Sequence, residues 1–194
     1  MWTTKPLTAP QMSIATWTES ELQENLHSLA ATLGQSLAER GLMVRTAESC
    51  TGGAIARALT EMSGSSAWFD CAYVTYSNDA KMRMLGVDPL ILEQHGAVSE
   101  AVALAMALGA LNGPGRAGAI DNSIQYLSTA VTGVAGPGGG SPDKPVGTVW
   151  FGWAGPASGG LKARAAMVKF DGDRSAVRLQ TAIYALQQIQ TFWL

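Results

Sequence analysis

The hydrophobic residues of this 194-residue chain follow two spacings, one typical of helices and the other of strands. Leucines recur at helical spacing over residues 22–37, directly after Thr18-Glu-Ser-Glu21, which matches a capping box and predicts a helix start. The nearly all-apolar segment from Ser99 to Leu111 predicts another helix, and neighbouring elements must cover most of its sides. Helical spacing over residues 173–193 predicts a final helix capped by Asp173.

Short apolar runs that end at glycine, proline or polar residues predict the strands. These runs are residues 42–44, 69–75, 127–131, 148–153 and 162–170. Gly155-Pro-Ala-Ser-Gly-Gly160 joins the last two, and so short a connection forces them to be antiparallel. Shorter helices are predicted over residues 54–61, around Lys81 and from Asp88 to Gly96. Strands that alternate with helices predict an α/β fold, and the antiparallel pair makes its sheet mixed.

Between the first strand and the next helix lies Thr46-Ala-Glu-Ser-Cys-Thr-Gly-Gly53. A strand–turn–helix connection exposes a small side chain at the carboxyl end of the strand, and the free N–H groups of the helix point at whatever binds there. Ser49 is the residue at that point. The alternative interpretation is that Ser49 only caps the helix and the glycines only permit the turn.

A second polar cluster follows the strand over residues 69–75. It consists of Tyr76, Ser77, Asn78 and Lys81. Open α/β sheets place ligand-binding groups at the carboxyl ends of their strands, so this cluster is a candidate part of the same site. Alternatively, Asn78 simply caps the short helix that carries Lys81.

Residues 132–147 are richer in glycine and proline than a plain connection between strands requires, which favours a backbone that approaches a ligand closely. The segment is not a Walker loop, because no Gly-Lys-Ser/Thr ends it. It is not a dinucleotide fingerprint either, because it leads to a strand instead of a helix. Arg174 and Arg178 project together near the start of the last helix and form a candidate phosphate site, unless they only belong to a solvated face.

Composition excludes several classes of protein. The length and the 47% of hydrophobic residues predict a single domain, residues 20–194, after a flexible amino-terminal tail, residues 1–19. The formal net charge is -2 and there is no stripe of Lys and Arg, so no nucleic-acid partner is expected. The tail has no signal-peptide core and no window could span a bilayer, which predicts a cytoplasmic protein with no membrane partner.

The few cysteines and histidines give no sign of a disulfide framework or a metal centre. Cys50 and Cys71 are the only cysteines, and His27 and His95 stand in unrelated contexts. We therefore expect a reducing compartment and no metal or other cofactor.

Over roughly residues 20–192, the chain resembles the carboxy-terminal domain family of the competence and damage-inducible protein CinA. Stand-alone members of this family are nicotinamide-nucleotide amidases. The resemblance rests on several motifs in the family's order, which are Thr46-Ala-Glu-Ser-Cys-Thr-Gly-Gly53, Gly64-Ser-Ser-Ala-Trp-Phe69, Thr75-Tyr-Ser-Asn78 with Lys81, Gln94-His-Gly-Ala-Val-Ser-Glu100, Thr132-Gly-Val-Ala-Gly-Pro137, Lys144-Pro-Val-Gly-Thr-Val149 and Gly172-Asp-Arg174. It implies a three-layer α/β/α sandwich on a mixed, mostly parallel sheet of about five strands.

The resemblance also implies hydrolysis of the carboxamide of nicotinamide mononucleotide to nicotinic acid mononucleotide and ammonia. Ser49 matches the nucleophile of the family, and Tyr76 and Lys81 match its helpers. The N–H groups of Cys50 to Gly52 would stabilise the oxyanion, and Arg174 with the glycine loop would hold the phosphate. The full set of predicted substrate-binding residues is Glu48, Cys50, Thr51, Gly52, Gly53, Asn78, Thr132, Gly133, Gly136, Gly138 and Arg174.

Two rival interpretations stay open at the level of the sequence. One is a non-catalytic nucleotide-binding or regulatory module that keeps the pocket without turnover. The other is a different amidohydrolase that uses Cys50 as its nucleophile. The sequence also leaves open whether the chain forms a homo-oligomer.

Overall fold

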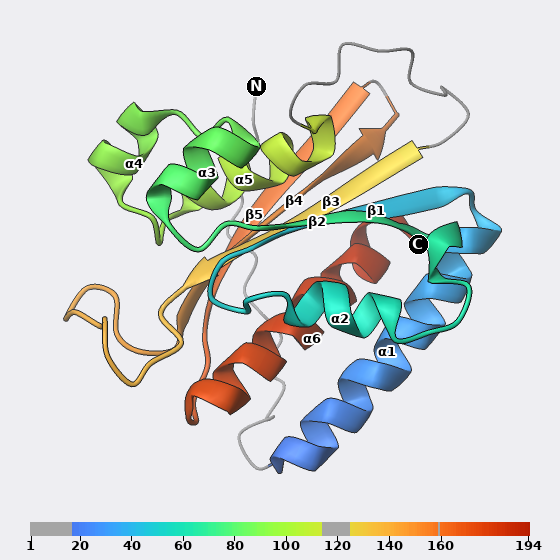
Figure 1. Cartoon of the computed structure of the whole chain (residues 1–194), viewed down its shortest axis with the longest axis horizontal. Coiled ribbons are helices and arrows are strands. Elements are labelled where there is room, and N and C mark those ends of the chain that lie inside the picture. The colour runs from blue at the N-terminus through green and yellow to red at the C-terminus, as the bar shows by residue number, and fades with distance from the viewer. Residues whose placement is uncertain (1–16, 114–124, 159) are drawn as a thin grey trace.

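A five-stranded sheet forms the middle layer of the protein, in the strand order β2-β1-β3-β4-β5 (Figure 1). This computed structural model describes residues 17–113, 125–158 and 160–194. β1 is parallel to both β2 and β3, whereas β4 is antiparallel to both β3 and β5, so β4 alone runs against the other strands. The predicted mixed, mostly parallel sheet is therefore confirmed. The strands are β1 (Leu42–Glu48), β2 (Phe69–Val74), β3 (Gln125–Gly133), β4 (Thr148–Ala157) and β5 (Gly160–Lys169).

Helices cover both faces of the sheet and complete three layers (Figure 1). One face carries α1 (Glu19–Glu39), α2 (Ala54–Thr60) and α6 (Arg174–Trp193). The other carries α3 (Asn78–Leu85), α4 (Pro89–His95) and α5 (Glu100–Asn112). A single 3-10 turn, η1 (Ser65–Ala67), precedes β2.

Capping residues define most of the helix starts, as their local sequence predicts. Thr18 forms the predicted capping box with Glu21, and Asp173 accepts a hydrogen bond from the N–H of Ala176 at the start of α6. At α3 the cap is Ser77 and Asn78 is the first helical residue, so the alternative in which Asn78 caps this helix is wrong. α1 begins at Glu19, one residue inside the predicted tail, and residues 1–16 of that tail lie outside the described part of the chain.

β4 is longer than its sequence pattern suggests. Gly155 and Pro156, which were predicted to be part of a loop, belong to the strand and pair with Lys162 and Leu161. Close packing explains the glycine, because a Cβ at position 155 would lie 2.5 Å from Leu127 Cδ2 and 3.0 Å from atoms of the Trp193 indole ring. Pairing with β5 therefore continues the strand through residues that usually mark a turn.

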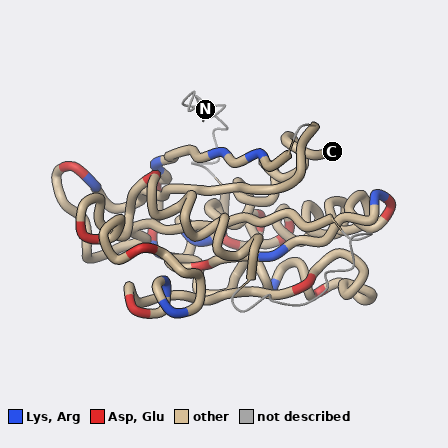
Figure 2. The backbone as a smooth tube through the Cα atoms, turned by 90° about the horizontal axis from the view of Figure 1, so that it is seen from above, with Lys and Arg blue, Asp and Glu red and all other residues tan. Residues whose placement is uncertain are grey.

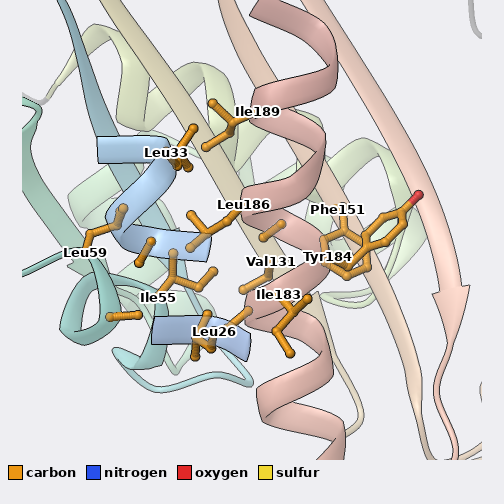
Figure 3. Packing of buried hydrophobic residues seen from close by; sticks show 14 of the residues in the cluster. Leu26, Leu33, Ile55, Leu59, Val131, Phe151, Ile183, Tyr184, Leu186 and Ile189 are labelled. Atoms are coloured by element: carbon orange, nitrogen blue, oxygen red, sulfur yellow. The ribbon is translucent and has the colours of Figure 1, made fainter. Parts of the chain in front are cut away.

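The main hydrophobic core lies between the sheet and the layer of α1, α2 and α6. Figure 3 shows Leu33, Leu186 and Ile189 meeting between α1 and α6, and all three are buried. Phe151 of β4 packs against Tyr184 of α6, with their ring centroids 4.8 Å apart. Truncating one such buried leucine to alanine typically costs about 2–5 kcal/mol of stability.

Acidic and basic residues are interspersed over the described backbone (Figure 2). The edge strand β5 carries Lys162, Arg164 and Lys169. Basic residues on an edge strand disfavour pairing with the edge of another sheet. Within the described ranges, no helix has both the length and the apolar character that crossing a bilayer requires.

Candidate active site

Ser49 lies directly after β1, where three parallel strands end side by side. Its backbone N–H donates to the carbonyl of Val131 on β3 at 3.1 Å, and the N–H of Thr75 donates to the carbonyl of Glu48 at 2.8 Å. These two bonds continue the ladders of β1 for one residue beyond the strand. Ser49 is 9% exposed and is therefore held on a rigid edge of the sheet instead of a loose loop.

Lys81 of α3 reaches Ser49 from the α3–α5 face of the sheet. Its Nζ donates to Ser49 Oγ at 3.1 Å and to the carbonyl oxygen of Thr75 at 2.9 Å. Lys81 is 1% exposed, and no carboxylate in the described part of the chain forms an ion pair with it. Burial of the ammonium lowers the pKa of Lys81, because the charged form is desolvated. A lysine held in this way can take up a proton from the serine hydroxyl.

A tight turn follows Ser49 and leaves two backbone donors free. The N–H of Gly52 closes the turn on the carbonyl of Ser49 at 3.1 Å. It is therefore not available for an oxyanion, although the sequence had predicted that it would be. The N–H groups of Cys50 and Thr51 donate to no oxygen or nitrogen acceptor among the described residues, although both lie near the Cys50 sulfur and lower the pKa of that thiol, against the larger effect of burial. Two neighbouring free N–H groups beside a hydroxyl form the arrangement that stabilises an oxyanion.

The carboxylate of Glu48 fills the amino terminus of α2. It accepts hydrogen bonds from the N–H groups of Gly53 at 3.0 Å, Ile55 at 3.1 Å and Ala56 at 2.8 Å, and from Thr51 Oγ1 at 2.7 Å. The predicted open helix terminus is therefore wrong, because a side chain of the protein already satisfies its donors. Since the carboxylate is fully buried beneath the turn, we assign Glu48 to holding the turn and not to substrate contact. The helix cap itself is Gly53, so the alternative in which Ser49 caps α2 is also wrong.

The thiol of Cys50 points into the hydrophobic core. Burial raises the pKa of Cys50 to about 12, and the negative charge of Glu48 contributes to the rise. A thiol with this pKa stays protonated near neutral pH, and the thiolate is the reactive form. The geometry therefore disfavours Cys50 as a nucleophile.

Tyr76, Arg174 and the glycine loop come together at the same end of the sheet. Arg174 donates from Nη1 to the carbonyl of Gly136 at 2.8 Å and from Nη2 to Tyr76 Oη at 2.9 Å. The ring of Tyr76 remains 61% exposed beside this contact. A pocket of about 510 Å³ adjoins Arg174 and is lined by Ala135, Gly136, Pro137, Val146, Gly172, Asp173, Arg174 and Ser175. Within the described part of the chain, Tyr76 forms no hydrogen bond with Ser49 or Lys81.

Several predicted binding residues have identifiable structural roles. Thr132 Oγ1 donates to the carbonyl of Ala97 at 2.7 Å and so ties β3 to the segment before α5. Gly133 lies so close to β4 that a Cβ there would be 2.7 Å from the carbonyl oxygen of Thr148. Gly138 and Asn78 are exposed, and a Cβ at position 138 would meet no atom within 4 Å.

Arg178 does not join Arg174 in the predicted phosphate site. Its Nε and Nη2 both donate to the carbonyl oxygen of Thr51, at 3.1 and 2.6 Å, so this guanidinium holds the turn after Ser49. Sequence reasoning placed Arg178 beside Arg174 because the two residues are four positions apart on a helix. Their long side chains contact different partners. The spacing of the two arginines along the helix does not predict this difference.

In the described ranges, no group of three or more His, Cys, Asp or Glu side chains could hold a metal ion. The chemistry that the described residues offer is that of a buried serine and lysine in hydrogen-bond contact, next to the N–H groups of Cys50 and Thr51. Fold and site together define the class of protein, an α/β/α sandwich with a serine–lysine pair where its parallel strands end.

Comparison with known proteins identifies the family. The model of the CinA C-terminal domain matches residues 26–193. The chain is 51% identical over 165 residues to the nicotinamide-nucleotide amidohydrolase PncC of Enterobacter agglomerans, which covers 85% of this chain and 93% of that protein. It is 48% identical over 176 residues to the protein of the same name from Escherichia coli strain K12, over 91% of this chain and 95% of the relative. The chain belongs to the CinA C-terminal domain family.

Solved structures agree with this assignment. The crystal structure of the competence/damage inducible protein CihA from Agrobacterium tumefaciens is similar with a TM-score of 0.73 and 44% sequence identity, over 86% of this chain and 94% of that one. The competence damage-inducible protein A from Klebsiella pneumoniae gives a TM-score of 0.74 at 36% identity, over 87% and 99%. The predicted α/β fold and the resemblance stated from the motifs are both confirmed.

Proposed function

We propose that the protein hydrolyses the carboxamide of nicotinamide mononucleotide to nicotinic acid mononucleotide and ammonia. The observation that carries this proposal is the 3.1 Å hydrogen bond between Lys81 Nζ and Ser49 Oγ in a buried setting. A serine hydroxyl is too weak an acid to attack an amide near neutral pH unless a base takes its proton. The choice of substrate is supported by the relatives that share about half of the sequence and are named nicotinamide-nucleotide amidohydrolases.

In the first half-reaction, Ser49 Oγ attacks the carboxamide carbon while neutral Lys81 takes the hydroxyl proton. The oxyanion that forms accepts hydrogen bonds from the N–H groups of Cys50 and Thr51, which donate to no oxygen or nitrogen atom of the described residues. The C–N bond then breaks, and the proton held by Lys81 passes to the leaving nitrogen, so that ammonia departs. Water attacks the acyl-serine in the second half-reaction, and Lys81 again serves as the base.

Tyr76 and Arg174 take the remaining roles. Arg174, next to the carbonyl of Gly136 and the adjoining pocket, binds the phosphate of the mononucleotide. Tyr76 positions or relays the proton between Ser49 and the leaving group. This role is supported by the 61% exposure of Tyr76 and by its hydrogen bond with Arg174, which lines the proposed phosphate pocket.

Ammonia release from nicotinamide mononucleotide by the wild-type protein tests the proposal directly. Ser49→Ala is expected to abolish ammonia release and to leave binding of the mononucleotide largely intact, measured by calorimetry. Tight binding without ammonia release by the wild type would instead support a non-catalytic nucleotide-binding module. Turnover near the wild-type rate in Ser49→Ala would exclude the serine mechanism.

A further inference from the structure

We propose that Arg178 is a positioning residue that fixes the oxyanion-binding turn after Ser49. The inference rests on the proposed amidase function and deepens it. Ser49 and its turn lie between two helix layers, since Lys81 approaches from α3 on one face and Arg178 from α6 on the other. Arg178 therefore acts on the opposite side of the turn from the base.

The contact of Arg178 clamps one peptide group of the turn. Nε and Nη2 of Arg178 donate to the carbonyl oxygen of Thr51 at 3.1 and 2.6 Å. The N–H of the same peptide group, which belongs to Gly52, donates to the carbonyl of Ser49 at 3.1 Å. The other backbone donor to Thr51, the N–H of Ala54, lies farther away at 3.4 Å. The peptide between Thr51 and Gly52 is therefore held at both ends, and a charged group holds one of them.

This clamp determines where the free donors point. The N–H groups of Cys50 and Thr51 belong to the two peptide groups just before the clamped one. Rotation of the clamped peptide would change the backbone angles of Thr51 and turn these donors away from the oxyanion. Donors of this kind act on the transition state and must lie within about 0.5 Å of their productive positions, so displacement lowers kcat more than it raises KM.

Gly52 provides a second, independent observation. It adopts a φ of +61°, and a Cβ there would lie 3.2 Å from Nη2 of Arg178. Glycine at this position therefore adopts the left-handed conformation of the turn without steric cost, and it also leaves room for the guanidinium of Arg178. The sequence had predicted a substrate contact for this glycine, whereas the geometry gives it a packing role against Arg178.

Steady-state kinetics separate positioning from phosphate binding. Nicotinamide mononucleotide and nicotinamide riboside, which lacks the phosphate, are compared for the wild type, Arg178→Met and Arg178→Lys. Arg178→Met is expected to lower kcat on the order of 10²-fold for both substrates and to change KM by less than about threefold. Arg178→Lys is expected to recover about tenfold of that loss, because the ammonium can donate to the Thr51 carbonyl through one bond.

The matched control is Arg57→Met on α2, whose side chain is 81% exposed and pairs with Glu61 at 2.9 Å. It is expected to keep the wild-type kcat. An unchanged kcat in Arg178→Met overturns the inference. A rise in KM for the mononucleotide alone also overturns it and moves Arg178 to the phosphate site. If Arg178→Met does not fold, Arg178→Lys with the wild-type kcat overturns it equally.

A probe that does not depend on the nucleotide keeps the two proposals separable. A small fluorophosphonate reacts with an activated serine, because Ser49 Oγ bonds to phosphorus, fluoride leaves and the proton goes to Lys81. Mass spectrometry should show slower labelling of Ser49 in Arg178→Met, by about tenfold or more, since the phosphonyl oxygen uses the same donors. A wild type that is labelled but releases no ammonia overturns the proposed substrate alone. A wild type that does neither overturns both proposals, and equal labelling rates overturn the role of Arg178.

Discussion

Lys81 Nζ and Ser49 Oγ lie 3.1 Å apart although the two residues are separated by 32 positions in the chain. Their contact forms because Ser49 directly follows β1 and Lys81 lies one turn into α3, the helix that follows the neighbouring strand β2. Parallel pairing of the two strands brings their carboxyl ends to the same edge of the sheet. The geometry of the sheet therefore builds the pair, and burial lowers the pKa of Lys81 in the direction that the proposed role as a base requires.

Lys81 predicts the pH dependence of the reaction. Burial lowers its pKa below the ordinary value of 10.5, and in the proposed mechanism the neutral amine is the form that accepts the serine proton. The rate should therefore rise with pH through this lowered pKa, because each step up in pH increases the fraction of neutral amine. Lys81→Met, which is similar in length, should remove both the activity and this rising limb in a pH–rate profile.

Lys81→Arg separates a base from a positive charge. A guanidinium keeps its proton throughout the accessible pH range, so this variant should be as inactive as Lys81→Met. The measurement is kcat/KM for nicotinamide mononucleotide between neutral and alkaline pH. Activity in Lys81→Arg would show that residue 81 contributes only a positive charge. Tyr76 or a bound water would then be the base.

Cys50→Ala tests the rival cysteine mechanism. Burial raises the pKa of this thiol to about 12, so the thiolate is scarce near neutral pH and turnover should stay within about threefold of the wild type. Iodoacetamide should also fail to inactivate the folded wild-type enzyme. Complete loss of activity in a folded Cys50→Ala protein would favour the cysteine as nucleophile.

Arg174→Ala should affect the two nicotinamide substrates differently. Its guanidinium adjoins the pocket beside Gly136 and is proposed to meet only the phosphate. The variant should therefore raise KM for the mononucleotide about tenfold or more and leave KM for the riboside nearly unchanged. Equal losses for both substrates would remove Arg174 from the phosphate site.

Glu48→Gln tests the buried carboxylate under the turn. Both of its oxygens accept from N–H groups of α2, so the amide NH2 of glutamine must face a donor in either orientation. We expect a loss of about 2–4 kcal/mol in the free energy of unfolding, measured by urea denaturation. The exposed Glu93 on α4 supplies the control, because Glu93→Gln should leave the free energy of unfolding unchanged. A loss equal to that of the control would show that the carboxylate does not hold the turn.

Local sequence signals predicted most of the elements and the residues that begin them. Thr18, Ser99 and Asp173 cap helices where the sequence places them, because a cap depends on a side chain and an N–H group within three residues. The motif around Ser49 likewise marked the nucleophile candidate, since strand, turn and helix follow one another along the chain.

Contacts between distant segments decided the details of the site. Whether the donors of α2 are open or filled depends on Glu48, whose carboxylate the sequence shows only as one of several polar residues near the turn. β4 reaches Ala157 by pairing with β5, and Trp193 of α6 donates to the carbonyl of Pro156 in this segment. Neither outcome follows from periodicity, because neighbouring residues do not supply the partner.

The sequence by itself determined the order of strands and helices, the cap residues, the nucleophile candidate and the family, because these are written in short contiguous patterns. Only the tertiary structure decided that Lys81 meets Ser49, that Arg174 and Arg178 serve different segments, and that Glu48 is internal. The physical reason is that hydrogen bonds act over about 3 Å, and only the folded sheet brings side chains from separate elements within that distance.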